Sequence, residues 1–183
     1  NYHLSGSGTM TEVDGYVQLK VNANQSAEYI LDAVEPDLGD TVQTEFKFGY
    51  APDDYKGAGT GIRSSSSIIA GYLMKKAWGN TIKLQTYDGS SIQEQNMIVS
   101  VDPYQHMLLF EVILGSTDVG GGMCDVTFNV YDAENSNAPL GTLNTTTQIT
   151  TSRKWYISGQ GSVSSQAFDL SIVPEPASLI LMV

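Results

Sequence analysis

From Cys124 to Tyr131 the chain reads Cys-Asp-Val-Thr-Phe-Asn-Val-Tyr, with an apolar residue at every second position. Successive side chains of a β-strand point to opposite faces, so this spacing predicts a strand with one core face and one polar face. Cys124, on the apolar face, is the only cysteine of the chain. An intrachain disulfide is therefore excluded, and we interpret Cys124 as a buried core thiol rather than a nucleophile.

The same period of two recurs on both sides of this stretch. Alternating or apolar runs cover residues 17–21, 42–50, 82–87, 107–114 and 168–172. Turn-forming clusters of Gly, Pro, Asp and Asn separate them at 37–40, 53–61, 88–89, 102–103, 120–122 and 135–139. Many short strands without a long helix predict an all-β fold, a two-sheet antiparallel sandwich of the jelly-roll, concanavalin- or lectin-like kind.

The 183 residues suffice for one ordinary domain. We expect the sandwich to span residues 15–173, preceded by a flexible N-terminal arm at 1–14 and followed by a tail at 174–183. Two short segments, 26–34 and 74–78, are the best helical candidates; in the first, the apolar residues would share one face of a helix.

The net charge of the chain excludes some classes of binding partner. Nine Lys and Arg stand against 20 Asp and Glu, which gives a formal net charge of −11 at pH 7. An acidic field with scattered cations repels phosphate backbones and anionic bilayers. Nucleic acid is therefore excluded as a partner, and a membrane is expected only through the C-terminal segment. Divalent cations or neutral glycans fit such a surface.

The C-terminus contains the motif that carries most information. Val173-Pro174-Glu175-Pro176-Ala177-Ser178 precedes the apolar run Leu179-Ile180-Leu181-Met182-Val183. This end of the chain resembles the PEP-CTERM sorting signal of secreted bacterial proteins. The resemblance covers about the last 11 residues and implies sorting to the bacterial cell surface or extracellular matrix, with processing by an exosortase-type enzyme.

The apolar run is short for a membrane anchor. A helix needs about 20 apolar residues to cross a bilayer, and five follow Ser178, without the arginines that close the family's signal. One alternative is a rigid Pro-Glu-Pro spacer with a chance apolar end. Another is that residues 177–183 add a strand to the next copy of the chain and build a filament.

Two groups of polar residues are candidate binding sites. Asp125, Asn129 and Tyr131 share the polar face of the opening stretch, where acceptors and an aromatic ring suit a sugar; a plain solvated face is the alternative. A loop that concentrates side-chain oxygens is a candidate for Ca²⁺, or a cluster of turn formers; its residues are Asp132, Glu134, Asn135 and Asn137.

No catalytic set emerges. Glu111 is a carboxylate on an otherwise apolar run, which would suit a general acid, but Leu109 and Ile113 occupy the places of a second carboxylate. We therefore expect Glu111 to pair with a lysine such as Lys83 or Lys47. Trp78 and the pair at 155–156 could be stacking platforms for glycans, although large aromatics on strands usually belong to a core.

These observations predict a secreted, non-enzymatic bacterial surface protein that assembles into a matrix, sheath or filament. The alternative is a lectin-like carbohydrate-binding module on the cell surface. No cofactor other than Ca²⁺ is expected. The partner would be a second copy of the chain under the first hypothesis and a surface polysaccharide under the second.

Overall fold

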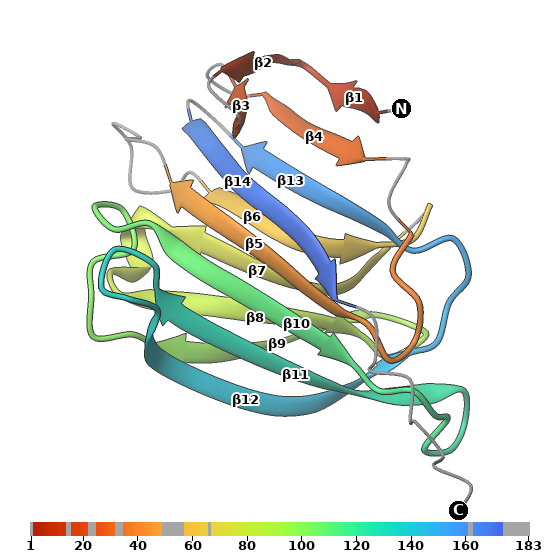
Figure 1. Cartoon of the computed structure of the whole chain (residues 1–183). Helices are drawn as coiled ribbons and strands as arrows, with labels where there is room; N and C mark the ends of the chain where they lie inside the picture. The colour runs from red at the N-terminus through yellow and green to blue at the C-terminus, as the bar shows by residue number, and fades with distance from the viewer. Residues whose placement is uncertain are drawn as a thin grey trace, which may run out of the picture.

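Two antiparallel sheets of seven strands each face one another (Figure 1). The computed structural model describes residues 2–13, 16–21, 25–31, 35–48, 57–65, 67–160 and 163–173. Sheet A contains, in spatial order, β1 (Tyr2–Gly6), β4 (Ser26–Leu31), β13 (Lys154–Gln160), β6 (Gly57–Arg63), β7 (Ile68–Lys75), β8 (Thr81–Tyr87) and β9 (Ile92–Ile98). Sheet B contains β12 (Ala138–Gln148), β11 (Met123–Asp132), β10 (Leu108–Leu114), β5 (Thr41–Phe48), β14 (Val163–Val173), β3 (Tyr16–Val21) and β2 (Gly8–Val13). The predicted antiparallel sandwich is confirmed.

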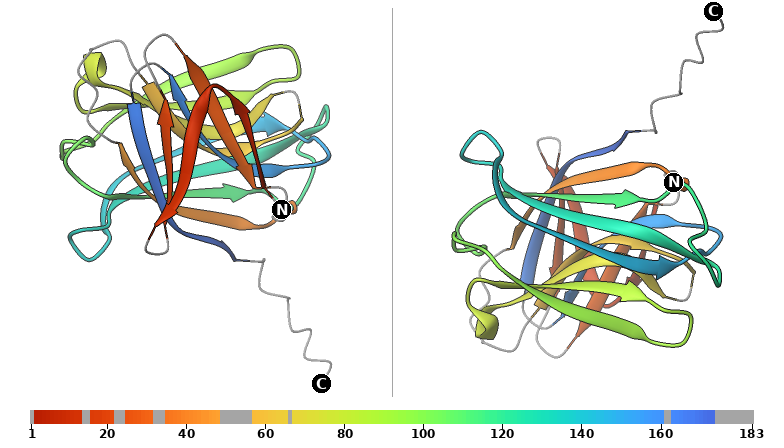
Figure 2. Two further views of the ribbon diagram at one scale, coloured as in Figure 1. Left: turned by 90° about the horizontal axis from the view of Figure 1, so that it is seen from above. Right: turned by 90° about the horizontal axis from the view of Figure 1, so that it is seen from below.

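Alternation along the strands builds the core between the two layers, which Figure 2 shows from above and below. In β11 every second residue is buried, including Cys124, which is 1% exposed, and Phe128. The same pattern in β5 buries Val42, Thr44 and Phe46. The buried thiol expected at Cys124 is confirmed, and burial raises the pKa of this thiol.

Polar contacts between described residues join the two sheets. The Tyr72 hydroxyl of β7 lies 2.6 Å from the Glu111 carbonyl and 2.9 Å from the Asn129 carbonyl of sheet B. Trp155 Nε1 of β13 donates to Thr44 Oγ1 at 2.9 Å. In a further contact, the Thr147 hydroxyl of β12 donates a hydrogen bond to the Ile69 carbonyl of β7 at 2.6 Å. Buried polar groups need partners, so these pairs determine how one sheet lies on the other.

The expectation of a flexible N-terminal arm is wrong, because the described N-terminal residues form strands of the sandwich. Residues 2–6 and 8–13 form β1 and β2, which pair with β4 in sheet A and with β3 in sheet B. The chain passes from one sheet to the other at Gly6, whose φ of 90° is readily adopted only by glycine. Gly6 and Ser7, at the junction of β1 and β2, form this corner.

Neither helical candidate forms an α-helix in the described residues, and residues 32–34 of the first candidate lie outside them. Residues 26–31 form β4, in which Ala27, Tyr29 and Ile30 are buried against sheet neighbours. In the segment 74–78 only a one-turn 3-10 helix follows β7, the helix η1 (Lys76–Trp78). Pairing on both edges of β4 outweighed the weak helical spacing, because local propensity is a small term beside tertiary burial.

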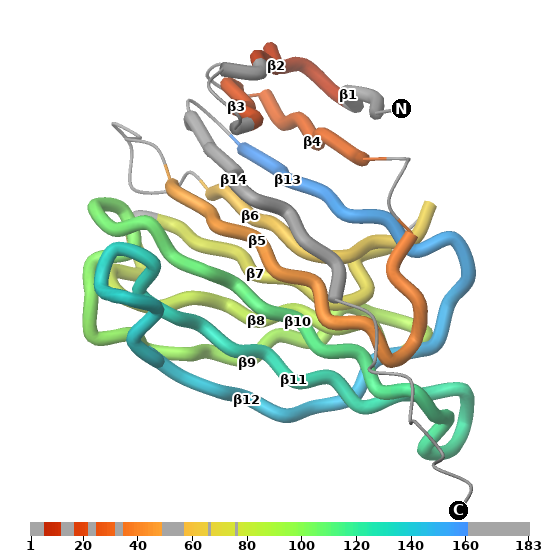
Figure 3. Tube along the Cα trace, viewed as in Figure 1, coloured from red at the N-terminus to blue at the C-terminus, as the bar shows by residue number. Residues whose placement is uncertain are grey.

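The edges of the two sheets meet at β9 and β12, which run along the same side of the sandwich (Figure 3). Gln95 Nε2 donates to Thr145 Oγ1 across this edge at 3.2 Å. Ile92 and Ile98 of β9 remain 43% and 79% exposed. Within the described residues, no helix is long and apolar enough to cross a membrane.

Replacing Tyr72 by Phe should lower the free energy of unfolding by about 1–3 kcal/mol, because the carbonyls of Glu111 and Asn129 lose the one hydroxyl proton that they share, while the aromatic packing remains. Urea denaturation of both proteins measures the difference. Tyr87→Phe is the matched control, since the Tyr87 hydroxyl donates to the Gly89 carbonyl at an exposed position. Equal effects of the two substitutions would contradict a specific role for the buried link.

Candidate functional site

On the outer face of sheet A, the outward-facing residues of β6 include three glycines, which we call the glycine floor. In β6, Ala58, Thr60 and Ile62 are at most 1% exposed and lie in the core, so the alternate residues face outward. These alternate residues are Gly57, Gly59 and Gly61. Without side chains on β6, the outer face is hollowed between the strands on either side. The sequence-based prediction of a turn over 53–61 was wrong from residue 57 onward.

At one end of the glycine floor, a tyrosine side chain from β13 covers the glycines. A Cβ added to Gly71 would lie 2.5 Å from the Tyr156 hydroxyl, so the tyrosine reaches across Gly61 to β7. Tyr156 is 1% exposed, and burial raises the pKa of its phenol. Arg63 of β6 forms an ion pair with Glu28 of β4, and this pair spans β13 because β13 lies between the two strands.

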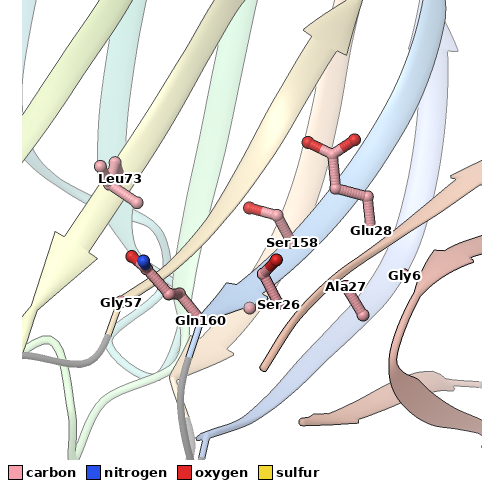
Figure 4. A pocket seen from close by; sticks show the side chains of 9 residues that line it. Gly6, Ser26, Ala27, Glu28, Gly57, Leu73, Ser158 and Gln160 are labelled. Atoms are coloured by element: carbon pink, nitrogen blue, oxygen red, sulfur yellow. The ribbon is translucent and has the colours of Figure 1, made fainter. Parts of the chain in front are cut away.

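The other end remains open as a groove of about 310 Å³. Figure 4 shows the polar side chains of Ser26, Glu28, Ser158 and Gln160 around it, with Leu73 opposite. The remaining lining residues are Gly6, Ala27, Gly57 and Gly159. One carboxylate, two hydroxyls and one amide therefore border a shallow space with one apolar wall.

A cross-strand row places the lining residues. Glu28 of β4 is opposite Ser158 of β13, which is opposite Gly59 of β6, which is opposite Leu73 of β7. Directly opposite residues on one face of a sheet lie side by side. The four strands come from distant parts of the chain, so the groove exists only in the folded sheet.

The residues predicted to bind glycan lie on the opposite face of the molecule, on sheet B. Asn129 Nδ2 and the Tyr131 hydroxyl donate to Glu111 Oε1 at 2.7 and 3.2 Å. Burial, followed by the Glu111 carboxylate, raises the pKa of Tyr131. Asp125 is exposed, and its backbone pairs with Gly115 rather than with this cluster. The structure thus brings two of the three residues together in a polar ladder.

The lysine expected beside Glu111 is replaced by amides. Gln43 Nε2 donates to Glu111 Oε2 at 2.6 Å, and Asn129 and Tyr131 occupy the other oxygen. Lys47 pairs with Glu134 at 3.7 Å, and Lys83 pairs with Glu94 on the other sheet. The prediction of a lysine partner was wrong because cross-strand register brings β5 and β11 amides, not their cations, opposite Glu111.

The candidate calcium loop is built as a turn. Asp132 is 5% exposed, and its Oδ1 accepts a hydrogen bond from the Glu134 amide at 3.1 Å. Glu134 Oε1 accepts from the Met107 amide at 3.0 Å, which together with Lys47 lowers the pKa of Glu134. Asn137 has a φ of 55° and is exposed, as is Asn135. Among the described residues, no group of three or more His, Cys, Asp or Glu is arranged to hold a metal ion.

The sorting motif begins at the end of β14, at Val173, and continues outside the described residues. Pro174 to Ser178 and the apolar run 179–183 therefore remain predictions. Trp155 and Tyr156, considered as stacking platforms, are buried.

One feature of the sequence indicates the bare strand beneath the groove on sheet A. Residues 57–62 alternate Gly with Ala, Thr and Ile, which is the period of a strand whose outer face has no side chains. Glycine in a strand often marks the close approach of another group. Ser158 and Glu28 had no such signal, because only sheet register brings them to the glycine floor.

Comparison with known proteins identifies the fold. No protein-family model matches the chain, and no curated protein matches it. Among solved structures, the chain is similar to the VIP36 exoplasmic/lumenal domain in its Ca²⁺/Man3GlcNAc-bound form, with a TM-score of 0.65, 14% identity, and coverage of 94% of this chain and 84% of that one. It is also similar to the legume lectin-like domain from Entamoeba histolytica, with a TM-score of 0.64, 11% identity, and coverage of 95% and 90%.

A bacterial protein is also among the similar solved structures. The carbohydrate binding module CBM66 from Bacillus subtilis matches with a TM-score of 0.56, 12% identity, and coverage of 92% of this chain and 94% of that chain. These likenesses show that the chain has a legume-lectin-like, jelly-roll fold.

The close packing around the glycine floor predicts how alanine substitutions there change the free energy of unfolding. A Cβ at Gly59 would lie 2.6 Å from the Tyr72 carbonyl, whereas at Gly57 the nearest atom is Lys75 Cγ at 3.2 Å. Gly59→Ala should therefore cost about 1–3 kcal/mol in free energy of unfolding, because backbone must shift. Gly57→Ala should cost less, since a lysine side chain can move. Urea denaturation compares them, and the reverse order would contradict this placement of β6.

Proposed function

We propose that the protein is a carbohydrate-binding, lectin-like module whose ligand binds in the groove on the outer face of sheet A. The observation that carries the proposal is a polar-lined hollow over a glycine floor on the sheet of a lectin-like sandwich. The similar VIP36 structure is a Man3GlcNAc-bound form, and CBM66 is a carbohydrate binding module.

The chemistry of the groove suits a sugar. Hydroxyls of Ser26 and Ser158 both donate and accept hydrogen bonds, the Gln160 amide does the same, and the Glu28 carboxylate accepts. Leu73 offers apolar surface to the C–H face of a sugar ring. A volume of about 310 Å³ lies at the lower end of the range for small-molecule sites, roughly 300–1,000 Å³. One or two sugar units of a longer chain would fill it.

Binding without hydrolysis is the function we propose. Glycoside hydrolysis generally uses a pair of carboxylates that flank the scissile bond. Among the nine residues that line the groove, Glu28 is the one carboxylate, and it is engaged by Arg63. We therefore assign Glu28 to ligand recognition and to the ion pair over β13.

Location at the bacterial cell surface remains part of the proposal. Its support is the sorting-like sequence at Val173 to Ser178, with processing by an exosortase-type enzyme as the resemblance implies. A surface polysaccharide would then be the partner. Self-assembly through residues 179–183 stays a prediction, since these residues lie outside the described part of the chain.

The test compares the two faces of the sandwich. Ser158→Ala combined with Gln160→Ala should weaken binding to the best ligand of a glycan panel at least about tenfold, because two hydrogen-bonding groups of the groove are lost. Isothermal titration calorimetry measures the affinity of each variant.

Tyr131→Ala is the matched control, because it removes a half-buried polar aromatic from the outer face of sheet B. We expect its glycan affinity to equal that of the wild type. Loss of binding in Tyr131→Ala, with binding kept in the groove variant, would move the site to sheet B. Absence of binding to every glycan would refute the proposed function.

A further inference from the structure

The charged residues that lie on the strands are unevenly distributed between the two sheets. The described strands of sheet A together with η1 contain five of the nine cations and two carboxylates, which are Arg63, Lys75, Lys76, Lys83 and Lys154 against Glu28 and Glu94. The strands of sheet B have the opposite balance, with Lys20 and Lys47 against Glu12, Glu45, Glu111, Asp125, Asp132 and Asp169. The sheet that contains the groove is therefore the cationic one.

Two of these lysines gather around one tryptophan. Lys75 Nζ of β7 lies 5.1 Å from the centroid of the Trp78 ring, and Lys83 Nζ of β8 lies 4.5 Å from it. An indole face attracts ammonium groups through its quadrupole, so Trp78 holds two like charges close together. The half-buried Trp78, considered from the sequence as a stacking platform, is thus a positioning residue for two cations.

A single carboxylate balances this pair. Lys83 Nζ lies 2.5 Å from Glu94 Oε2, and Gln85 Nε2 donates to Glu94 Oε1 at 2.9 Å. The hydrogen bond from Lys83, followed by that from Gln85, lowers the pKa of Glu94, so this carboxyl is ionised at neutral pH. Among the described carboxylates, none lies within 4 Å of Lys75 Nζ. Within the described part of the chain, this cluster therefore contains one more cation than carboxylate.

This cationic cluster borders the groove. Lys83 is directly opposite Leu73, whose side chain lines the groove. The Lys75 side chain runs beside Gly57, since a Cβ added there would lie 3.2 Å from its Cγ and 3.3 Å from its Cε. A ligand in the groove that extends toward β8 would meet these two ammonium groups.

We infer that the groove binds a polysaccharide whose sugars carry carboxylates, a uronic-acid polymer, with Lys75 and Lys83 contacting the carboxylate. This inference rests on the proposed function and names its ligand class. It replaces the neutral glycan expected from the overall acidity, because the surplus cation lies where the sugar would bind. One surplus charge matches the single carboxylate of one uronic-acid unit in the groove, whereas a sugar unit with several sulfates would leave negative charge unpaired there, on a protein whose net charge of −11 already opposes any anion.

The experiment uses matched ligands and matched variants. Oligosaccharides of galacturonate, mannuronate and hyaluronan are each compared with their carboxyl-reduced, neutral counterparts, and an oligosaccharide of sulfated dextran is included. All titrations contain EDTA, so that divalent ions cannot bridge protein and ligand. We expect at least one uronate to bind tenfold or more tightly than its reduced form, with an affinity that falls as NaCl rises.

Lys75→Gln with Lys83→Gln should weaken uronate binding at least tenfold and remove most of its salt dependence, while binding of the reduced oligosaccharide changes less than twofold. Lys20→Gln with Lys47→Gln removes the same charge from sheet B and should leave uronate binding unchanged. Lys75→Gln alone keeps the Lys83–Glu94 ion pair and serves if the double variant does not fold. Thermal melting verifies the fold of each variant.

Four results would overturn the inference. Equal binding of a uronate and its reduced form, or of sulfated dextran and a uronate, would refute selectivity for carboxylates while the proposed function stands. Equal weakening by the sheet A and sheet B variants would show a general charge effect instead of a site. Absence of binding to every glycan, neutral or acidic, would remove the proposed function and this inference together.

Discussion

The packing of Tyr72 between the sheets is the contact on which the rest of the structure depends. Its ring stacks on Phe110 with centroids 4.2 Å apart and meets Phe128 edge to face at 5.2 Å. Its hydroxyl reaches the carbonyls of Glu111 and Asn129. One side chain of sheet A thereby fixes the lateral position and the distance of two sheet B strands. Desolvating that hydroxyl without acceptors would be costly, so few other ways of stacking the sheets remain.

Because the contacts that hold the two sheets together lie in the core, the outer faces of the sheets can differ in composition. On sheet B the outer face is a ladder of amides, hydroxyls and Glu111, whose hydrogen-bonding groups largely satisfy one another. On sheet A the glycines of β6 leave a hollow, and polar groups at its rim, such as Ser158, face solvent. Groups that already bond to one another offer less to a ligand than groups bordering open space. This difference, rather than the number of polar residues, favours sheet A as the binding face.

Several features of this arrangement were accessible from the residues alone. Period-two runs such as 42–48 and 124–131 correctly predicted strands, their buried faces and the buried Cys124. They failed where a run was short or rich in small residues. Residues 1–14 and 57–61 contain glycines that indicate flexibility in isolation, yet in β1, β2 and β6 those glycines make a sheet corner and a floor. The candidate glycan residues were predicted from one strand, which cannot reveal how its neighbours satisfy Asn129 and Tyr131.

The sequence by itself determined the all-β class, the two-sheet sandwich, the inward-facing residues and the overall acidity, because each depends on composition or on spacing within one strand. Only the tertiary structure decided which polar groups meet. Glu28, Ser158 and Leu73 become neighbours through cross-strand register over β6. Lys75 and Lys83 become a pair through the β7–β8 hairpin and the ring of Trp78. Register is set by the packing of whole sheets, so the glycine alternation at 57–62 indicates a bare strand face, but no local pattern indicates which polar groups and charges lie beside it.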